Sequence, residues 1–161
     1  MWGGLRIHSE NNFDAVWDAY DTYIQQLPKD GKAHLYVDFT RRNGSLLAAT
    51  FMAYPELVQD PAIFDSFRSI PSEYDSLRLA NYSGLSEEQA EAIFSRGRRN
   101  SGWTQAIEYD IDLIKSIQEF WVKGTESISE KVDAGLDFNM IAPSMRNWAA
   151  RNRSANVLGL E

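Results

Sequence analysis

Hydrophobic and polar residues alternate along the segment from 33 to 54, and the alternation is interrupted once, at Arg41-Arg42-Asn43-Gly44. A period of two residues is typical of a strand that buries one of its faces. Asn-Gly between two apolar runs is a strong signal of a hairpin turn, because both residues tolerate a positive φ. The pattern therefore predicts a β-hairpin with strands at about 33–40 and 45–54.

The first strand of the predicted hairpin has two chemically different faces. One face is apolar and carries Leu35, Val37 and Phe39. The other face is polar and partly aromatic and carries His34, Tyr36, Asp38 and Thr40. Since successive side chains of a strand point to opposite sides, the polar face either contacts water or lines a site.

A period near 3.6 residues indicates the helices. Between Ser9 and Leu27, apolar residues recur at spacings of three and four and form one wide stripe. The capping box Ser86-Glu-Glu-Gln89 predicts the start of a second helix, and Asp110 is the expected N-cap of a third. Two further helices are expected, after Asp60-Pro61 and from about 143 to 152.

Four more strands are expected at 2–8, 73–82, 102–109 and 134–141. The resulting order is β-α-β-β-α-β-α-β-α-β-α within a single domain, residues 1–161. Hairpins with helical connections favour an α+β fold, in which helices pack on one face of an antiparallel or mixed sheet. The other face is then free, and we expect a pocket there.

Composition narrows the classes of partner. The net charge is -7 and the pI about 4.9, which argues against nucleic acid and against an anionic membrane surface, because both need a basic face. No apolar run approaches the roughly 18 residues that span a bilayer, and no signal-peptide core occurs, so we expect a cytoplasmic protein. The chain has no cysteine and two histidines, so we expect no metal site.

The candidate site is the polar face of the hairpin together with its neighbouring strands. The candidate catalytic residues are Tyr36, Asp38 and Gln105. The candidate substrate-binding residues are Thr50, Met52, Trp103 and Asn139. An apolar surface with a few directed polar groups is typical of a ligand site, whereas a solvated face is expected to hold more lysine and glutamate. A solvated outer face stays open as the alternative.

The chain also resembles a known protein family in five segments that occur in order. They are "WGGLRIHSENNFDAVWDAY", "PKDGKAHLYVDFT", "PAIFDSFRSIPS", "GWTQAIEYDIDLI" and "NVLGLE". They are similar to the substrate-binding domain of fungal berberine-bridge-enzyme-like oxidases, FAD-linked flavoproteins of the vanillyl-alcohol-oxidase class. The resemblance implies an antiparallel sheet with helices on one face and the substrate, above the flavin ring, on the other.

Two departures from that family limit what the resemblance implies. The family holds FAD in a separate domain, and its flavin-attaching His or Cys motifs do not occur in this chain. The family often has Gln and then Pro near Phe138, where this chain has Asn139 and Met140. Because hydride transfer needs the cofactor, we expect no cofactor here and carry over no oxidase activity.

The first functional hypothesis is a flavin-free catalyst of fungal secondary-metabolite biosynthesis. It would bind a reactive polyene or quinone-methide-like intermediate and promote a cyclisation such as a Diels–Alder or hetero-Diels–Alder reaction. Such a pericyclase needs mainly proximity, shape and one or two hydrogen bonds. Asp38 would act as an acid or base if an elimination first generates the reactive species.

Two alternatives stay open. One is a non-catalytic binding or accessory protein for a hydrophobic or aromatic metabolite, and the other is a partial FAD-linked oxidase that needs a partner chain. An isolated substrate domain would expose sheet edges and apolar surface. We therefore also expect a homodimer.

Overall fold

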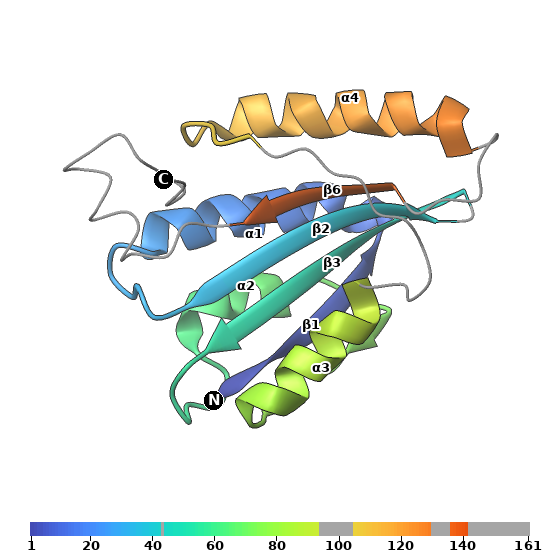
Figure 1. Cartoon of the computed structure of the whole chain (residues 1–161). Helices are drawn as coiled ribbons and strands as arrows, with labels where there is room; N and C mark the ends of the chain where they lie inside the picture. The colour runs from blue at the N-terminus through green and yellow to red at the C-terminus, as the bar shows by residue number, and fades with distance from the viewer. Residues whose placement is uncertain (43, 94–104, 130–135, 142–161) are drawn as a thin grey trace, which may run out of the picture.

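The computed structural model describes residues 1–42, 44–93, 105–129 and 136–141, and Figure 1 shows how they are arranged. The strands are β1 (Trp2–Ser9), β2 (His34–Arg42), β3 (Ser45–Tyr54), β4 (Tyr74–Asp75), β5 (Arg78–Leu79) and β6 (Leu136–Ile141). The α-helices are α1 (Phe13–Gln26), α2 (Asp65–Arg68), α3 (Tyr82–Ile93) and α4 (Ile111–Ser129). Two short 3-10 helices, η1 (Glu10–Asn12) and η2 (Ala62–Phe64), precede α1 and α2.

The described strands form one antiparallel sheet in the order β4-β1-β3-β2-β6, and β5 also pairs with β1. β2 and β3 are the predicted hairpin. Arg42 pairs with Ser45 across the turn, where Gly44 has a φ of 79°. The sequence-based prediction of an α+β fold with an antiparallel sheet is confirmed.

Three helices, α1, α2 and α4, cover one side of the sheet, which we call the helix face (Figure 1). The Trp17 ring stacks on Phe39 at a centroid distance of 4.7 Å. The Phe64 ring stacks on Trp2 at 5.5 Å and on Tyr23 at 5.7 Å. All five side chains are at most 1% exposed. Stacked rings add about 0.5–1.5 kcal/mol per pair to the gain from burial, so this face holds the main core.

The fourth helix, α3, lies on the opposite side of the sheet, which we call the second face (Figure 1). It approaches β1 at Gly3, where an added Cβ would lie 3.2 Å from Leu85 Cδ1 and 2.5 Å from the Met52 carbonyl oxygen. A glycine permits such close approach because it has no side chain. The expectation that all helices pack on one face is therefore corrected for α3.

The starts of two helices were predicted with different success. Asp110 caps α4 as predicted, because its Oδ1 accepts hydrogen bonds of 3.0 Å from the N–H groups of Asp112 and Leu113. α3 begins at Tyr82, upstream of the predicted capping box, and Asn81 Oδ1 accepts the N–H of Gly84 at 2.8 Å. Ser86 therefore lies inside α3, where its side chain is free to face the sheet.

Two predicted strands differ from the structure. The segment 73–82 contains only the two-residue strands β4 and β5. Residues 105–110 form no regular secondary structure, so the described part of the predicted strand 102–109 is wrong. Alternation alone does not make a strand, since a strand also needs a neighbour to pair with. The predicted helix at 143–152 lies outside the described residues.

Candidate functional site

The pairing of β2 with β3 decides which residues share the second face. Tyr36 pairs with Phe51, while Val37 pairs with Thr50 and Leu35 with Met52. Directly paired residues of an antiparallel ladder point to the same side. Thr50 and Met52 therefore lie on the helix face, and the prediction that they share a face with Tyr36 is wrong.

Burial agrees with this assignment. Thr50 is fully buried and its Oγ1 lies 3.2 Å from His8 Nε2, while Met52 is 2% exposed. The helix face thus uses Thr50 to satisfy a buried histidine, because a buried polar group without a partner is costly.

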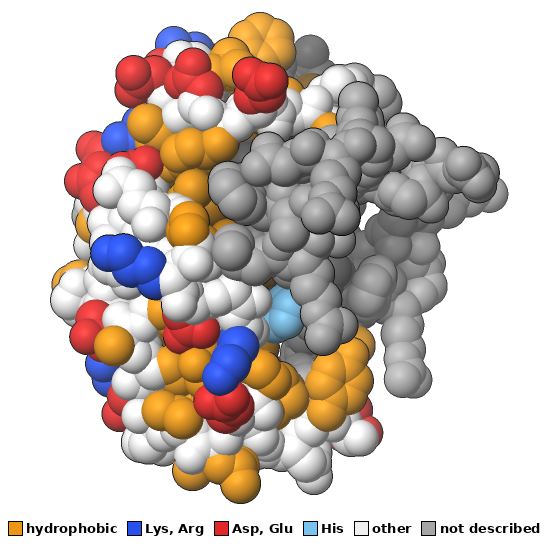
Figure 2. Space-filling model, turned by 90° about the vertical axis from the view of Figure 1, so that its left-hand side faces the viewer, with side chains coloured by type: hydrophobic (Ala, Val, Ile, Leu, Met, Phe, Trp, Pro, Cys, Tyr) orange, Lys and Arg blue, Asp and Glu red, His pale blue; other side chains and the backbone are white. Residues whose placement is uncertain are grey.

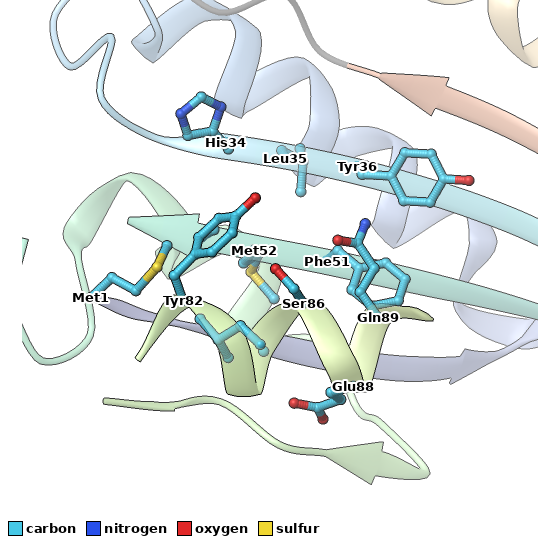
Figure 3. Close-up of a pocket in the computed structure, with 13 residues that line it drawn as sticks. Met1, His34, Leu35, Tyr36, Phe51, Met52, Tyr82, Ser86, Glu88 and Gln89 are labelled. Atoms are coloured by element: carbon cyan, nitrogen blue, oxygen red, sulfur yellow. The ribbon is translucent and has the colours of Figure 1, made fainter. Parts of the chain in front are cut away.

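A groove of about 220 Å³ runs along the second face between α3 and the hairpin. Figure 3 shows its walls and floor. The floor is formed by Phe51 and Ala53 of β3, and Met52 borders it between them. One wall is β2, with His34 and Tyr36. The other wall is α3, with Tyr82, Leu85, Ser86 and Gln89.

The α3 wall is polar because of helical periodicity. Tyr82, Ser86 and Gln89 are spaced by four and three residues, so they lie on one side of the helix. In Figure 3 these three side chains point toward β2, across the groove. The arrangement places hydroxyl and amide groups opposite His34 and Tyr36, with an apolar floor between them.

Glu88 holds α3 in place from the other side. Its Oε2 lies 2.8 Å from Arg78 Nη1, and its Oε1 accepts a hydrogen bond of 3.4 Å from the Tyr74 hydroxyl. Burial acts to raise the pKa of Glu88, but hydrogen bonds from Ser76 and Arg78 outweigh it and hold the pKa below its ordinary value. Glu88 is therefore an ionised anchor that ties α3 to the edge strands.

Tyr36 is the half-buried polar group of the β2 wall. Its ring centroid is 5.8 Å from that of Phe51. Burial raises the pKa of its phenol, and the carboxyl groups of Asp38 and Asp137 add to the effect. The Tyr36 phenol therefore stays protonated well above neutral pH.

The polar surface continues from Tyr36 onto β6. Asp38 is 7% exposed and pairs in register with Asn139, as their predicted shared face requires. The Thr40 hydroxyl donates a hydrogen bond of 2.7 Å to Asp137 Oδ1. Asp38 is not among the residues that border the groove, so it lies beside the groove on the same face.

Gln105, a predicted catalytic residue, does not join the groove. Gln105 is exposed, and its Nε2 donates to the carbonyl oxygen of the adjacent Ala106 at 3.1 Å. Trp103 lies outside the described residues. Of the predicted set, Tyr36 and Met52 border the groove.

The residues of the α3 wall were not predicted as site residues from the sequence. Tyr82, Ser86 and Gln89 have helical spacing, but the capping box at Ser86 set the predicted helix start too late to include Tyr82. Asn81 followed by Tyr-Ser-Gly is the signal for the earlier start, because asparagine is a preferred N-cap.

A metal centre finds no support in the described part of the chain, where no three His, Asp or Glu side chains gather in a group able to hold an ion. His8 has a structural role. Its ring is fully buried, its Nδ1 donates to the Pro71 carbonyl oxygen at 2.9 Å, and its Nε2 accepts from Thr50. Among the described helices, none combines the length and apolarity that crossing a membrane requires.

Figure 2 shows the surface at the left-hand side of Figure 1. Acidic and basic side chains are interspersed there with hydrophobic ones, and no continuous basic area forms among the coloured residues. Comparison of the chain with protein-family models, with curated proteins and with solved structures found no match. The geometry of the groove therefore carries the functional argument.

Proposed function

We propose that the groove binds a small, largely apolar molecule and promotes its ring closure without flavin. The observation that carries the proposal is the apolar floor of Phe51 and Ala53 between two polar walls. A ligand site of this composition gains affinity from the apolar area it covers and orientation from its few polar groups.

The walls would orient the ligand. A carbonyl group on the ligand would accept a hydrogen bond from the Tyr36 hydroxyl, which keeps its proton because burial and neighbouring carboxylates raise its pKa. Ser86 and Gln89 would hold the opposite edge of the ligand. A flat molecule lying on Phe51 would thus be fixed at both edges.

A Diels–Alder ring closure is a reaction that such orientation of the ligand would promote. Two new σ bonds form as three π bonds are converted into one, with no oxidant and no proton exchanged, so the protein needs to supply only shape and polarisation of the carbonyl. Holding both reacting ends together lowers the entropic part of the barrier, and a hydrogen bond to the carbonyl withdraws electron density from the reacting alkene.

The size of the groove limits the ligand. About 220 Å³ is below the roughly 300–1,000 Å³ that is usual for drug-sized ligands. We therefore expect a molecule of about two fused rings, with one edge in solvent. Asp38, which lies outside the groove, enters the proposal through its effect on Tyr36.

Binding is tested first, with 1,4-naphthoquinone and naphthalene as a pair of probes that differ in their carbonyl groups. We expect backbone amide shifts in ¹⁵N NMR spectra at Ala53, Ser86 and Gln89. We also expect about fivefold weaker binding of naphthalene, because a hydrogen bond contributes about 1 kcal/mol net. Tyr36→Phe is expected to remove the difference between the probes. Leu57→Ala, which truncates a side chain that is 79% exposed and outside the groove, is the control.

Catalysis is tested with a linear trienone that closes spontaneously to a bicyclic ketone. The rate with protein is compared with the background rate, and Tyr36→Phe is expected to reduce any acceleration. Binding of the probes without acceleration would support the accessory-protein hypothesis instead. Absence of groove shifts with either probe would overturn the proposal.

A further inference from the structure

α3 is attached to the sheet in a different way from the helices of the helix face. From Tyr82 to Ala90, the part of α3 whose side chains the structure describes, no residue is buried. α1, in contrast, buries Trp17, Tyr20 and Tyr23 in the main core. Helices in proteins are stabilised mostly by the packing of an apolar side. α3 therefore gains less from burial and depends more on its polar contacts.

The polar contacts of α3 gather at Glu88. Glu88 borders the groove, but Figure 3 shows its carboxylate on the side of α3 that faces away from β2. Its side chain is 17% exposed, and its Oε2 lies 2.8 Å from Arg78 Nη1. The same Nη1 donates a hydrogen bond of 2.8 Å to the Ser76 carbonyl oxygen. Arg78 thus bridges α3 and the segment that carries β4 and β5.

Ser76 gives this bridge a fixed base on β1. The Ser76 N–H donates to the Leu5 carbonyl oxygen at 3.0 Å, and the Leu5 N–H donates to Ser76 Oγ at 2.9 Å. Gly4 leaves room for this approach, since an added Cβ there would lie 2.7 Å from the Ser76 carbonyl oxygen. The contacts therefore form a connected network from β1 to Glu88, and a network of charges stabilises more than an isolated surface ion pair does.

The network acts on the part of α3 that carries the groove wall. Gln89 directly follows Glu88, and Ser86 lies two residues before it, so both depend on Glu88 for their distance from β2. The start of α3 is held separately, by the Asn81 cap and by the contact of Leu85 with Gly3. If Glu88 were released, α3 would therefore pivot around its N-terminal end and widen the groove.

We propose that Arg78 and Glu88 are positioning residues for the groove, and that α3 opens around its N-terminal end to exchange ligand when their ion pair breaks. Arg78 does not border the groove, so it acts on a ligand through Glu88. Because α3 lies outside the main core, it can open while the helix face stays folded. A ligand held between α3 and β2 would favour the closed position. The ligand is that of the proposed function, on which this inference rests, whereas the opening of α3 is a property of the protein alone.

The opening is tested on the full chain without ligand, by amide hydrogen exchange followed in ¹⁵N NMR spectra. Glu88→Gln removes the charge and keeps the helix propensity. We expect at least about fivefold faster exchange for the α3 amides at 86–89, as the loss of about 1 kcal/mol predicts. The β3 amides at 48–52 are expected to exchange as in the wild type. Glu87→Gln makes the same change at the exposed neighbour of Glu88 and is the matched control, with unchanged exchange expected.

The effect on the groove is tested with 1,4-naphthoquinone. We expect Glu88→Gln and Arg78→Gln each to raise its Kd about fivefold. The double variant is also expected to show about a fivefold rise rather than about a 25-fold one, because the second substitution removes a partner that is already lost. Glu87→Gln is expected to leave the Kd unchanged.

The outcomes separate this inference from the proposed function. Unchanged α3 exchange in Glu88→Gln would overturn the inference, as would equal acceleration in α3 and β3. A wild type that binds 1,4-naphthoquinone, with a Kd that neither substitution changes, would also overturn it and leave the proposed function standing. A wild type that does not bind the probe contradicts the proposed function, and the exchange of the protein alone still decides whether the ion pair holds α3.

Discussion

The helix face and the second face of the sheet are built from the same two strands, yet they differ in how they treat aromatic side chains. On the helix face, Trp17 and Phe39 stack and are at most 1% exposed. On the second face, Tyr36 and Phe51 also contact each other, but both are only half-buried and border the groove. Fully buried rings stabilise the fold, whereas half-buried rings leave apolar area for a ligand. The comparison indicates that the helix face mainly stabilises the fold, whereas the second face is suited to binding.

Polar groups show the same difference. On the helix face, Arg6 is 6% exposed, and its guanidinium bonds the Phe67 carbonyl oxygen, Ser72 Oγ at 2.9 Å and Asp75 at 2.9 Å. On the second face, the groove walls hold the exposed side chains of His34, Tyr82 and Gln89. Buried polar groups must be satisfied within the protein, while those of the groove stay accessible to a ligand.

The largest expected effect comes from truncating one ring on each face. Trp17→Ala removes a fully buried ring and is expected to lower the free energy of unfolding by about 3–5 kcal/mol. Phe51→Ala removes a half-buried ring, so we expect a loss of about 1–2 kcal/mol, because less area returns to water. Urea denaturation of both variants measures the difference. Equal losses of unfolding free energy would contradict the conclusion that the helix face contributes more to stability than the second face.

A smaller effect is expected where α3 meets the sheet. In Gly3→Ala the new Cβ would lie 2.5 Å from the Met52 carbonyl oxygen, which is backbone and cannot rotate away. We expect the free energy of unfolding to fall by about 1–3 kcal/mol and the amide shifts of α3 to change. Gly124→Ala is the matched control, since its Cβ has no neighbour within 4 Å. The control is expected to gain about 0.5–1 kcal/mol, because alanine favours a helix. A Gly3→Ala variant as stable as the wild type would show that the β3 backbone and Leu85 do not approach Gly3 as closely as these distances indicate.

The two faces of β2 were predicted correctly from the sequence. Apolar and polar residues alternate strictly in 34–40, so the residues can be divided between the two faces in only one way. The sequence also contained the information for β3. Arg42 pairs with Ser45 across the turn, so every odd residue of one strand pairs with an even residue of the other. Thr50 must then share a side with Val37. The wrong face for Thr50 and Met52 came from reading each strand separately.

The groove was harder to predict, because its second wall depends on tertiary packing. The bare backbone of Gly3 admits Leu85, and this contact places α3 over the second face. Nothing in the local pattern of 82–93 specifies which side of the sheet the helix takes. The strand expected near Gln105 is absent for a similar reason, since residues 105–109 pair with none of the described strands.

The smallest expected effect is a pH dependence that arises on the helix face. Burial lowers the pKa of His8 below the ordinary value of 6.5, and the charge of Arg6 adds to this, while the bond to Pro71 and the charge of Asp75 act in the opposite direction. His8 is therefore neutral in the folded state at a pH where the unfolded chain begins to bind a proton. Its contribution to stability is fully present above pH 6.5 and is lost as the pH falls from there through the folded-state pKa.

Urea denaturation between about pH 8 and pH 5 measures this loss. His8→Gln removes the titrating group, so its stability curve should fall less steeply below pH 6.5 than that of the wild type. His34→Gln is the matched control on the second face, because His34 is exposed and its curve should follow the wild type. If both substitutions flatten the curve equally, or if neither does, the histidine of the helix face is not the buried neutral group that its contacts with Pro71 and Thr50 indicate.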